Sequence, residues 1–440
     1  MKILKAFVLL SLVIGLAAVS AFTVVFAIDY DEAPIHYSTM PADDPVARLI
    51  KRLDAGQTKL TWDQSFGWLP SLLKELKIPV SSQVLVYSKT SLQRERISPD
   101  APRALYFNDE SYIGMVQYGD VLEISSTDPR QGTMFYILSQ RNDQVSAVVR
   151  QTHECLQCHD SNNFTGGVPG LVVRSVFTGV DGRPVLTAGS HITDQRSPWE
   201  NRWGGWYVTG EYGDLPHLGN QVFSNDVTPE TVNRQPSTKL RRLDQLIDTS
   251  SYLSAHSDVV ALMVLVHQAQ MHNLLTRASY EARKALSDDS VMNAALGRPV
   301  DFRSDTAKRR IAHVGEALLR HLLFVDEMPI TAPIRGSSTF SADFQTVGPS
   351  DPFGRSLRQL DLQTRLFRFP CSYLIYSESF DALPPVVHEF VLQRLLQILT
   401  GVDQSSAFGH ISAADRRAIL EILVATKKSL PPAYPEALSQ

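Results

Sequence analysis

Residues 104–126 read ALYFNDESYIGMVQYGDVLEISS, and this stretch decides the fold expected for the first half of the chain. Three short runs of apolar, β-branched and aromatic residues, at 104–107, 112–116 and 121–124, are separated by Asn-Asp and Gly-Asp turn signals. Such closely spaced runs are typical of antiparallel strands. Similar runs at 84–87, 134–138 and 147–149 extend the pattern, and strand-like runs resume at 171–173 and 206–208. We therefore expect an antiparallel sheet in this half.

The remaining segments are predicted to be mainly helical. Short amphipathic helices are expected at 44–53 and 70–77, and longer ones at about 257–286, 307–324, 385–399 and 412–427. The last of these opens with Ser412-x-x-Asp415, a capping box. The pattern predicts an α+β fold, with a β-containing N-terminal half followed by a mainly α-helical C-terminal half.

Length and composition suggest how the chain is divided. Its 440 residues are enough for two or three domains. We expect a leader at 1–27, a mixed α/β domain at 28–235, a helical region at 236–330, a loop at 331–360 and a C-terminal helical region at 361–440. The loop is expected because residues 329–356 are rich in Gly, Pro, Ser and Thr.

The first domain contains Cys155-Leu156-Gln157-Cys158-His159, the C-x-x-C-H pattern of covalent haem attachment. Two thiols at this spacing can each bond one vinyl group on the same edge of a haem. The histidine that follows, His159, then supplies the proximal imidazole to the iron. The chain has only 3 cysteines, which is too few for a disulfide framework. The third is Cys371, in an apolar and aromatic stretch. A structural zinc site or a redox C-x-x-C pair are the alternatives, although no second C-x-x-C is present.

The N-terminus carries an export signal. Two lysines, Lys2 and Lys5, precede an uncharged apolar run from 6 to 28. The run is also long enough to span a bilayer, which takes about 20 apolar residues, so a cleaved signal peptide and an uncleaved anchor both remain open. Either way, the rest of the chain is expected in the periplasm or at the outer face of the inner membrane, where haem attachment takes place.

Charge gives little information on partners. The chain has 42 Lys+Arg against 46 Asp+Glu, a net of −4, and no basic run of the kind that follows nucleic acid. We expect no nucleic-acid partner. A redox partner protein or a membrane electron-transfer chain fits better, with a single N-terminal anchor as the one membrane contact.

The sixth ligand of the iron decides between electron transfer and chemistry at an open iron. The candidates on the helix expected at 257–286 are His267, Met271 and His272. Met263, His267 and Met271 share an apolar face, where a structural role in the core is the alternative. Candidates near the motif in sequence are His153, His191, His217 and Met134. Arg202 and Trp203, in an aromatic cluster with Trp199 and Trp206, are candidates to line the haem cleft.

The motif and the leader together resemble the mono-haem c-type cytochromes. Further segments are similar to a family of large, uncharacterised exported bacterial proteins with one C-x-x-C-H; they lie at 85–91, 102–109, 202–210 and 267–273. The segment 166–171 also resembles the Gly-Pro loop of class I cytochromes c. That resemblance implies that the Pro169 carbonyl accepts a hydrogen bond from the proximal histidine. The chain is several times longer than a class I cytochrome and has β-rich sequence before the motif, so their all-helical fold is not expected.

These observations predict an exported cytochrome that binds one haem c and transfers electrons. A haem enzyme of peroxidase or oxidase type and a haem-based sensor, both with an open distal side, are the alternatives. A zinc-stapled interaction protein is the reading without haem.

Overall fold

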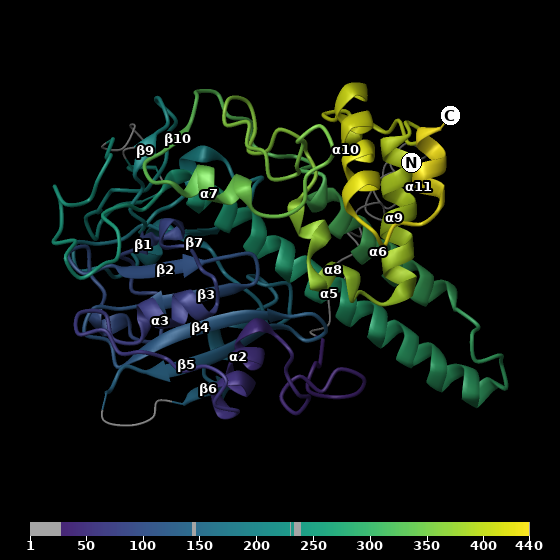
Figure 1. Cartoon of the computed structure of the whole chain (residues 1–440), viewed down its shortest axis with the longest axis horizontal. Helices are drawn as coiled ribbons and strands as arrows, with labels where there is room; N and C mark the ends of the chain where they lie inside the picture. The colour runs from purple at the N-terminus through teal and green to yellow at the C-terminus, as the bar shows by residue number, and fades with distance from the viewer. Residues whose placement is uncertain (1–27, 143–146, 229, 233–238, 440) are drawn as a thin grey trace, which may run out of the picture.

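The computed structural model describes residues 28–142, 147–228, 230–232 and 239–439, so the predicted leader lies outside the described residues. The fold is α+β, as predicted. Six strands form one sheet in the order β1-β2-β3-β4-β5-β6, and every neighbouring pair is antiparallel (Figure 1). The strands are β1 (Val84–Val86), β2 (Arg103–Phe107), β3 (Ser111–Met115), β4 (Val121–Asp128), β5 (Gly132–Ser139) and β6 (Val148–Gln151).

The register of this sheet gives its two faces different roles. One row of facing residues runs across five strands: Phe107, Tyr112, Ser125, Phe135 and Gln151. Because side chains alternate along a strand, these residues lie on one face of the sheet, which we call the motif face. The opposite face packs on two short helices, α2 (Pro45–Asp54) and α3 (Leu69–Glu75), in one hydrophobic cluster. Asp44 caps α2 and also accepts a hydrogen bond from the Tyr136 hydroxyl of β5.

The helix α5 (Val259–Leu296) is the longest element and crosses the whole molecule (Figure 1). Asp258 caps its N-terminus by accepting from two backbone N–H groups, and Gly297 ends it in the left-handed conformation. By length and composition α5 would also suit a membrane span. However, 89% of its most apolar window is buried inside the protein, as in the core helix of a folded domain.

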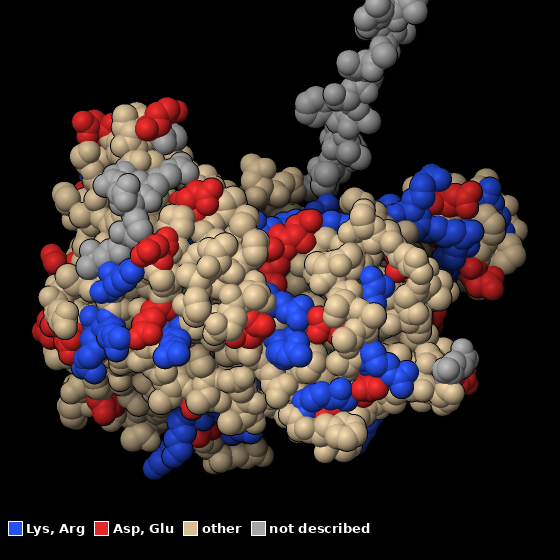
Figure 2. All heavy atoms as spheres, turned by 90° about the horizontal axis from the view of Figure 1, so that it is seen from above, with Lys and Arg blue, Asp and Glu red and all other residues tan. Residues whose placement is uncertain are grey.

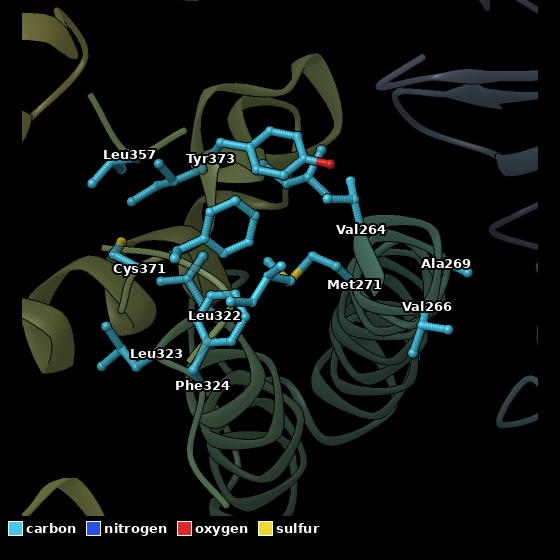
Figure 3. Close-up of a cluster of buried hydrophobic side chains, with 14 of the residues drawn as sticks. Val264, Val266, Ala269, Met271, Leu322, Leu323, Phe324, Leu357, Cys371 and Tyr373 are labelled. Atoms are coloured by element: carbon cyan, nitrogen blue, oxygen red, sulfur yellow. The ribbon is translucent and has the colours of Figure 1, made fainter. Parts of the chain in front are cut away.

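The C-terminal helices form a second hydrophobic cluster with α5, part of which Figure 3 shows. They are α6 (Asp305–Leu322), α8 (Glu378–Asp381), α9 (Pro385–Leu399), α10 (Ala413–Thr426) and α11 (Ala433–Leu438). Of these, α6, α8 and α9 contact α5, and α10 packs on α9 and α11. The cap predicted for α10 is confirmed, because the Ser412 hydroxyl accepts from the Asp415 N–H at 3.0 Å. Cys371 is fully buried in this cluster.

The connecting segments differ from the prediction in several places. The apolar runs at 171–173 and 206–208 lie outside the ladder strands, apart from an isolated bridge between Trp206 and Val86; β7 (Arg174–Val176) and β8 (Ser190–Ile192) form a small antiparallel pair instead. The loop predicted at 331–360 contains β10 (Arg335–Gly336), which pairs with β9 (Gly210–Glu211), and the helix α7 (Phe340–Thr346). The other short helices are α4 (Leu156–His159) and the 3₁₀ turns at Val80–Ser82, Arg94–Arg96, Leu186–Ala188, Trp199–Asn201, Tyr373–Tyr376 and Ser406–Phe408.

Candidate haem site

The C-x-x-C-H motif forms a single helical turn directly after β6. The turn is α4, and the His159 N–H donates to the Cys155 carbonyl at 3.0 Å. This turn brings the two thiols onto neighbouring positions, with Cys158 exposed and Cys155 half-buried at the edge of the sheet. Both thiols are free of disulfide bonds. Burial, and then the nearby Glu123, raise the pKa of the Cys155 thiol to about 11.

The imidazole of His159 is held in the tautomer that a metal ligand needs. Its Nδ1 lies 2.8 Å from the Gly170 carbonyl oxygen, so Nδ1–H donates and Nε2 keeps its lone pair. The ring rests against Phe135 on the motif face, with 4.9 Å between ring centroids. Burial lowers the pKa of His159, which keeps the imidazole neutral. The prediction that the Pro169 carbonyl accepts this hydrogen bond is therefore wrong by one residue. The acceptor is the carbonyl of Gly170, the next residue in the loop.

The loop that supplies this carbonyl is pinned to α5 by Asn273. The Asn273 side chain accepts from the Leu171 N–H at 2.8 Å and donates to the Leu171 carbonyl at 2.8 Å. Gly170 has no side chain where the two segments meet; a Cβ there would lie 2.4 Å from the Asn273 amide oxygen. Gly166 and Gly167 turn the chain with φ of +77° and +76°, which glycine adopts without strain. A long helix thus fixes the acceptor that orients His159.

Beside the motif, the motif face of the sheet carries an ion pair and an open apolar strip. Arg103 of β2 pairs with Glu123 of β4 at 2.6 Å. The Arg103 guanidinium lies over Gly114, where a Cβ would come within 2.5 Å of it. The Arg103 Nε–H is buried without an acceptor among the described residues. The fields of Arg103 and Glu123 reach both Cys155 and His159, since they act on the pKa values of both groups.

The apolar strip consists of partly exposed residues of three strands. Leu105 and Ile137 are half-buried and Val149 is 49% exposed, although all three lie on the motif face. A haem needs two thiols, a neutral imidazole, apolar surface along its plane and cations near its carboxylates. Free thiols, a fixed imidazole, partly exposed apolar residues and an arginine with an unused N–H meet here, so the residues fit the group.

The three residues of α5 that were candidates for the sixth ligand of the iron are held by hydrogen bonds or packed in the core. His267 is fully buried, with Nδ1 at 2.6 Å from the Gln195 amide oxygen and Nε2 at 2.7 Å from the Ser372 hydroxyl. Iron binding by His267 would break one of these hydrogen bonds. Met271 points into the cluster between α5 and α6, toward Leu322 and Phe324 (Figure 3). In this arrangement His267 and Met271 serve the core.

His272 lies against the turn between β2 and β3. Its Nε2–H donates to the Asp109 carbonyl at 2.7 Å, and its ring meets the edge of Tyr112. Nδ1 is buried and has no hydrogen-bond partner among the described residues. Burial lowers the pKa of His272 to about 4, so the imidazole is neutral.

Arg202 and Trp203 are used elsewhere than expected. The Arg202 guanidinium is buried, donates to the Ser197 and Gln195 carbonyls, and lies over the Trp199 ring. Trp203 is also buried, in the cluster of the helical half rather than in the cluster that contains Cys155. The guanidinium is committed to backbone carbonyls, which a sequence pattern could not reveal.

The candidates near the motif in sequence divide between surface and core. His153 is exposed and His191 is half-buried on the small hairpin. His217 and Met134 are buried, and Met134 lies on the sheet face opposite the motif face. Among the described residues, no group of three or more His, Cys, Asp or Glu side chains is arranged to hold a metal ion.

The sequence did not predict two of the candidate site residues, Asn273 and Arg103. Asn273 lies within the His267–Asn273 stretch, but its partner is 102 residues away. Arg103 stands in a strand as an ordinary charged residue, and only the register shows that it faces the motif. Comparison with protein-family models, with curated proteins and with solved structures gave no match.

Proposed function

We propose that this protein is an exported c-type cytochrome that carries one covalent haem and transfers electrons. The observation that carries the proposal is the C-x-x-C-H turn, in which the Gly170 carbonyl holds the His159 Nδ1–H and leaves Nε2 available. When bound, haem c supplies one-electron exchange between ferric and ferrous iron. Cys155 and Cys158 would hold it, and His159 would be its proximal ligand.

The place of the protein follows from the same proposal. Thioether formation with haem requires export, and the apolar stretch before residue 28 would provide it as a signal peptide or as a single anchor. The partner is a redox protein or a membrane electron-transfer chain. Figure 2 shows acidic and basic side chains interspersed over one face, a pattern that suits transient contacts better than strong electrostatic steering.

A second candidate, a haem enzyme or sensor with an open distal side, is favoured by one observation. His267 has both ring nitrogens in hydrogen bonds, and the His272 Nε2 is also engaged. An iron without a sixth protein ligand would bind small molecules such as carbon monoxide or peroxide. The electron-transfer reading requires another ligand or a rearrangement of these side chains.

One experiment tests both functions. The full chain is produced in a host with haem c maturation, and its visible spectrum is recorded oxidised, reduced, and reduced with carbon monoxide. A covalent haem whose reduced spectrum carbon monoxide leaves unchanged supports the electron carrier, and a shift supports the open site. Cys371→Ser is the matched cysteine control, because Cys371 is buried in the helical cluster. Absence of haem from the wild-type protein would refute the proposal.

A further inference from the structure

A cleft of about 580 Å³ opens between the turn joining β2 to β3, the helix α7 and the segment around Tyr373. Five aromatic residues line it: Phe107, Phe340, Phe344, Tyr373 and Tyr376. This size and lining suit a small organic molecule with a planar ring, because ligand pockets are mainly apolar with a few placed polar groups.

Among the polar residues that line the cleft, an arginine and a carboxylate have hydrogen-bonding capacity that no described residue uses. Arg358 is buried, with its guanidinium 4.2 Å from the Tyr373 ring centroid and 4.7 Å from that of Phe344. One of its nitrogens, Nη2, pairs with Asp109, while Nε and Nη1 have no partner among the described residues. The Glu110 carboxylate also lines the cleft and makes no hydrogen bond to a described side chain or backbone group. The Arg358 guanidinium can donate to a ligand oxygen, and the Glu110 carboxylate can accept from a hydroxyl.

An unbroken series of bonds leads from this cleft to His159. The Asp109 carbonyl accepts from His272, and His272 is followed in α5 by Asn273. Asn273 holds Leu171 by two hydrogen bonds, and Gly170, next in the chain, accepts from the His159 Nδ1–H. Electron transfer is favoured along covalent and hydrogen-bonded connections over gaps through space. Covalent and hydrogen bonds therefore connect the cleft to the proximal ligand of the proposed haem, and electrons can follow them.

We infer that the cleft binds a small hydroquinone, a ring with two oxygens on opposite edges, and that this molecule donates electrons to the haem. The inference rests on the proposed function. One hydroquinone loses two electrons and two protons and becomes the quinone. Each electron reduces one ferric haem, so one hydroquinone reduces two protein molecules. One hydroxyl proton passes to Glu110 and then to water, and the other passes directly to water.

Burial and the nearby Glu378 raise the pKa of Glu110 to about 7. A pKa near neutral suits a group that accepts a proton from the ligand and then releases it to water.

Tetramethylhydroquinone is the probe, and its di-O-methyl ether is the redox-inert control compound. Calorimetry on the protein reduced beforehand with dithionite measures binding alone, and stopped-flow absorbance on the ferric protein measures haem reduction. Val347→Trp fills the cleft from its exposed rim, and Val300→Trp, at an exposed loop position between α5 and α6, is the control. Val347→Trp is expected to weaken binding about tenfold, which corresponds to about 1.4 kcal/mol.

Glu110→Gln separates binding from proton transfer. The amide keeps the shape of the carboxylate but cannot take the proton, so binding is expected to hold while haem reduction slows. Saturable binding lost in Val347→Trp and kept in Val300→Trp supports the inference. Non-saturable reduction, equal in both variants, overturns it while dithionite reduction still confirms a working haem. If no haem is incorporated, the proposed function fails, and calorimetry on the haem-free chain still tests whether the cleft binds the ring.

Discussion

Asn273→Ala should weaken the protein and disturb the haem site together. The side chain is 2% exposed and makes two hydrogen bonds of 2.8 Å to the backbone of Leu171. Leaving the buried partner of one hydrogen bond unsatisfied costs about 1–3 kcal/mol, so the loss of both bonds should cost about 2–6 kcal/mol. Urea unfolding followed by circular dichroism measures this loss. The freed loop also relaxes the Gly170 carbonyl, so the midpoint potential of the haem should shift.

Asn293→Ala is the matched control for this variant. Asn293 lies in the same helix, is equally buried, and donates one hydrogen bond of 2.9 Å to the Phe302 carbonyl near the exposed end of α5. It should cost about 1–3 kcal/mol without moving the midpoint potential. A stability of Asn273→Ala within about 0.5 kcal/mol of wild type, which is the spread of ordinary surface substitutions, would refute the reasoning. Equal potential shifts in both variants would refute the link to His159.

Three further outcomes are expected. Cys155→Ala with Cys158→Ala should leave no haem bound after denaturing electrophoresis and haem staining, whereas Cys371→Ser should retain it; haem staining in the double variant would count against thioether attachment. His267→Gln should lower the unfolding temperature but leave the haem spectrum unchanged, because the ring bonds Gln195 and Ser372; a spectral change would return His267 to the ligand candidates. Burial lowers the pKa of His321 from 6.5 to about 4. The unfolded chain therefore takes up this proton first as pH falls, and the free energy of unfolding should decrease by about 1.4 kcal/mol per pH unit across that interval. His321→Gln should reduce the slope of stability against pH, measured by urea titration, and an unchanged slope would contradict the assignment.

Much of the fold was predictable because local patterns and tertiary packing agree. All six strands of the main sheet lie where short apolar runs and turn signals placed them, and α9 has the bounds that were predicted. The prediction of strands at 171–173 and 206–208 was wrong, because an apolar run indicates that a segment is buried and does not show that it pairs in a sheet. Leu171 and Val173 are buried in the helical cluster but belong to no strand. In the last ten residues of α5 the apolar side chains Val291, Met292 and Leu296 are exposed, so the helical state of this stretch depends on propensity and on the Gly297 cap.

The site was predictable only where it is local in sequence. The spacing of Cys155, Cys158 and His159 alone predicts haem attachment. The groups around them come from distant segments of the chain. Asn273 belongs to α5, and Arg103 belongs to β2. Pro169 was one residue off because a loop pattern does not specify which carbonyl faces the ring. Partners of this kind become visible only once the register and the helix position are known.

The path of α5 has a consequence for how the chain can be divided. Tyr280 of this helix belongs to the cluster on the sheet, while most of the helix belongs to the cluster that also takes Phe107 and Tyr112 from β2 and β3. Neither cluster is complete without it. A fragment that ends before residue 259 would carry the C-x-x-C-H turn without the helix that holds its loop, so the two halves should melt as one unit and resist separation by limited proteolysis.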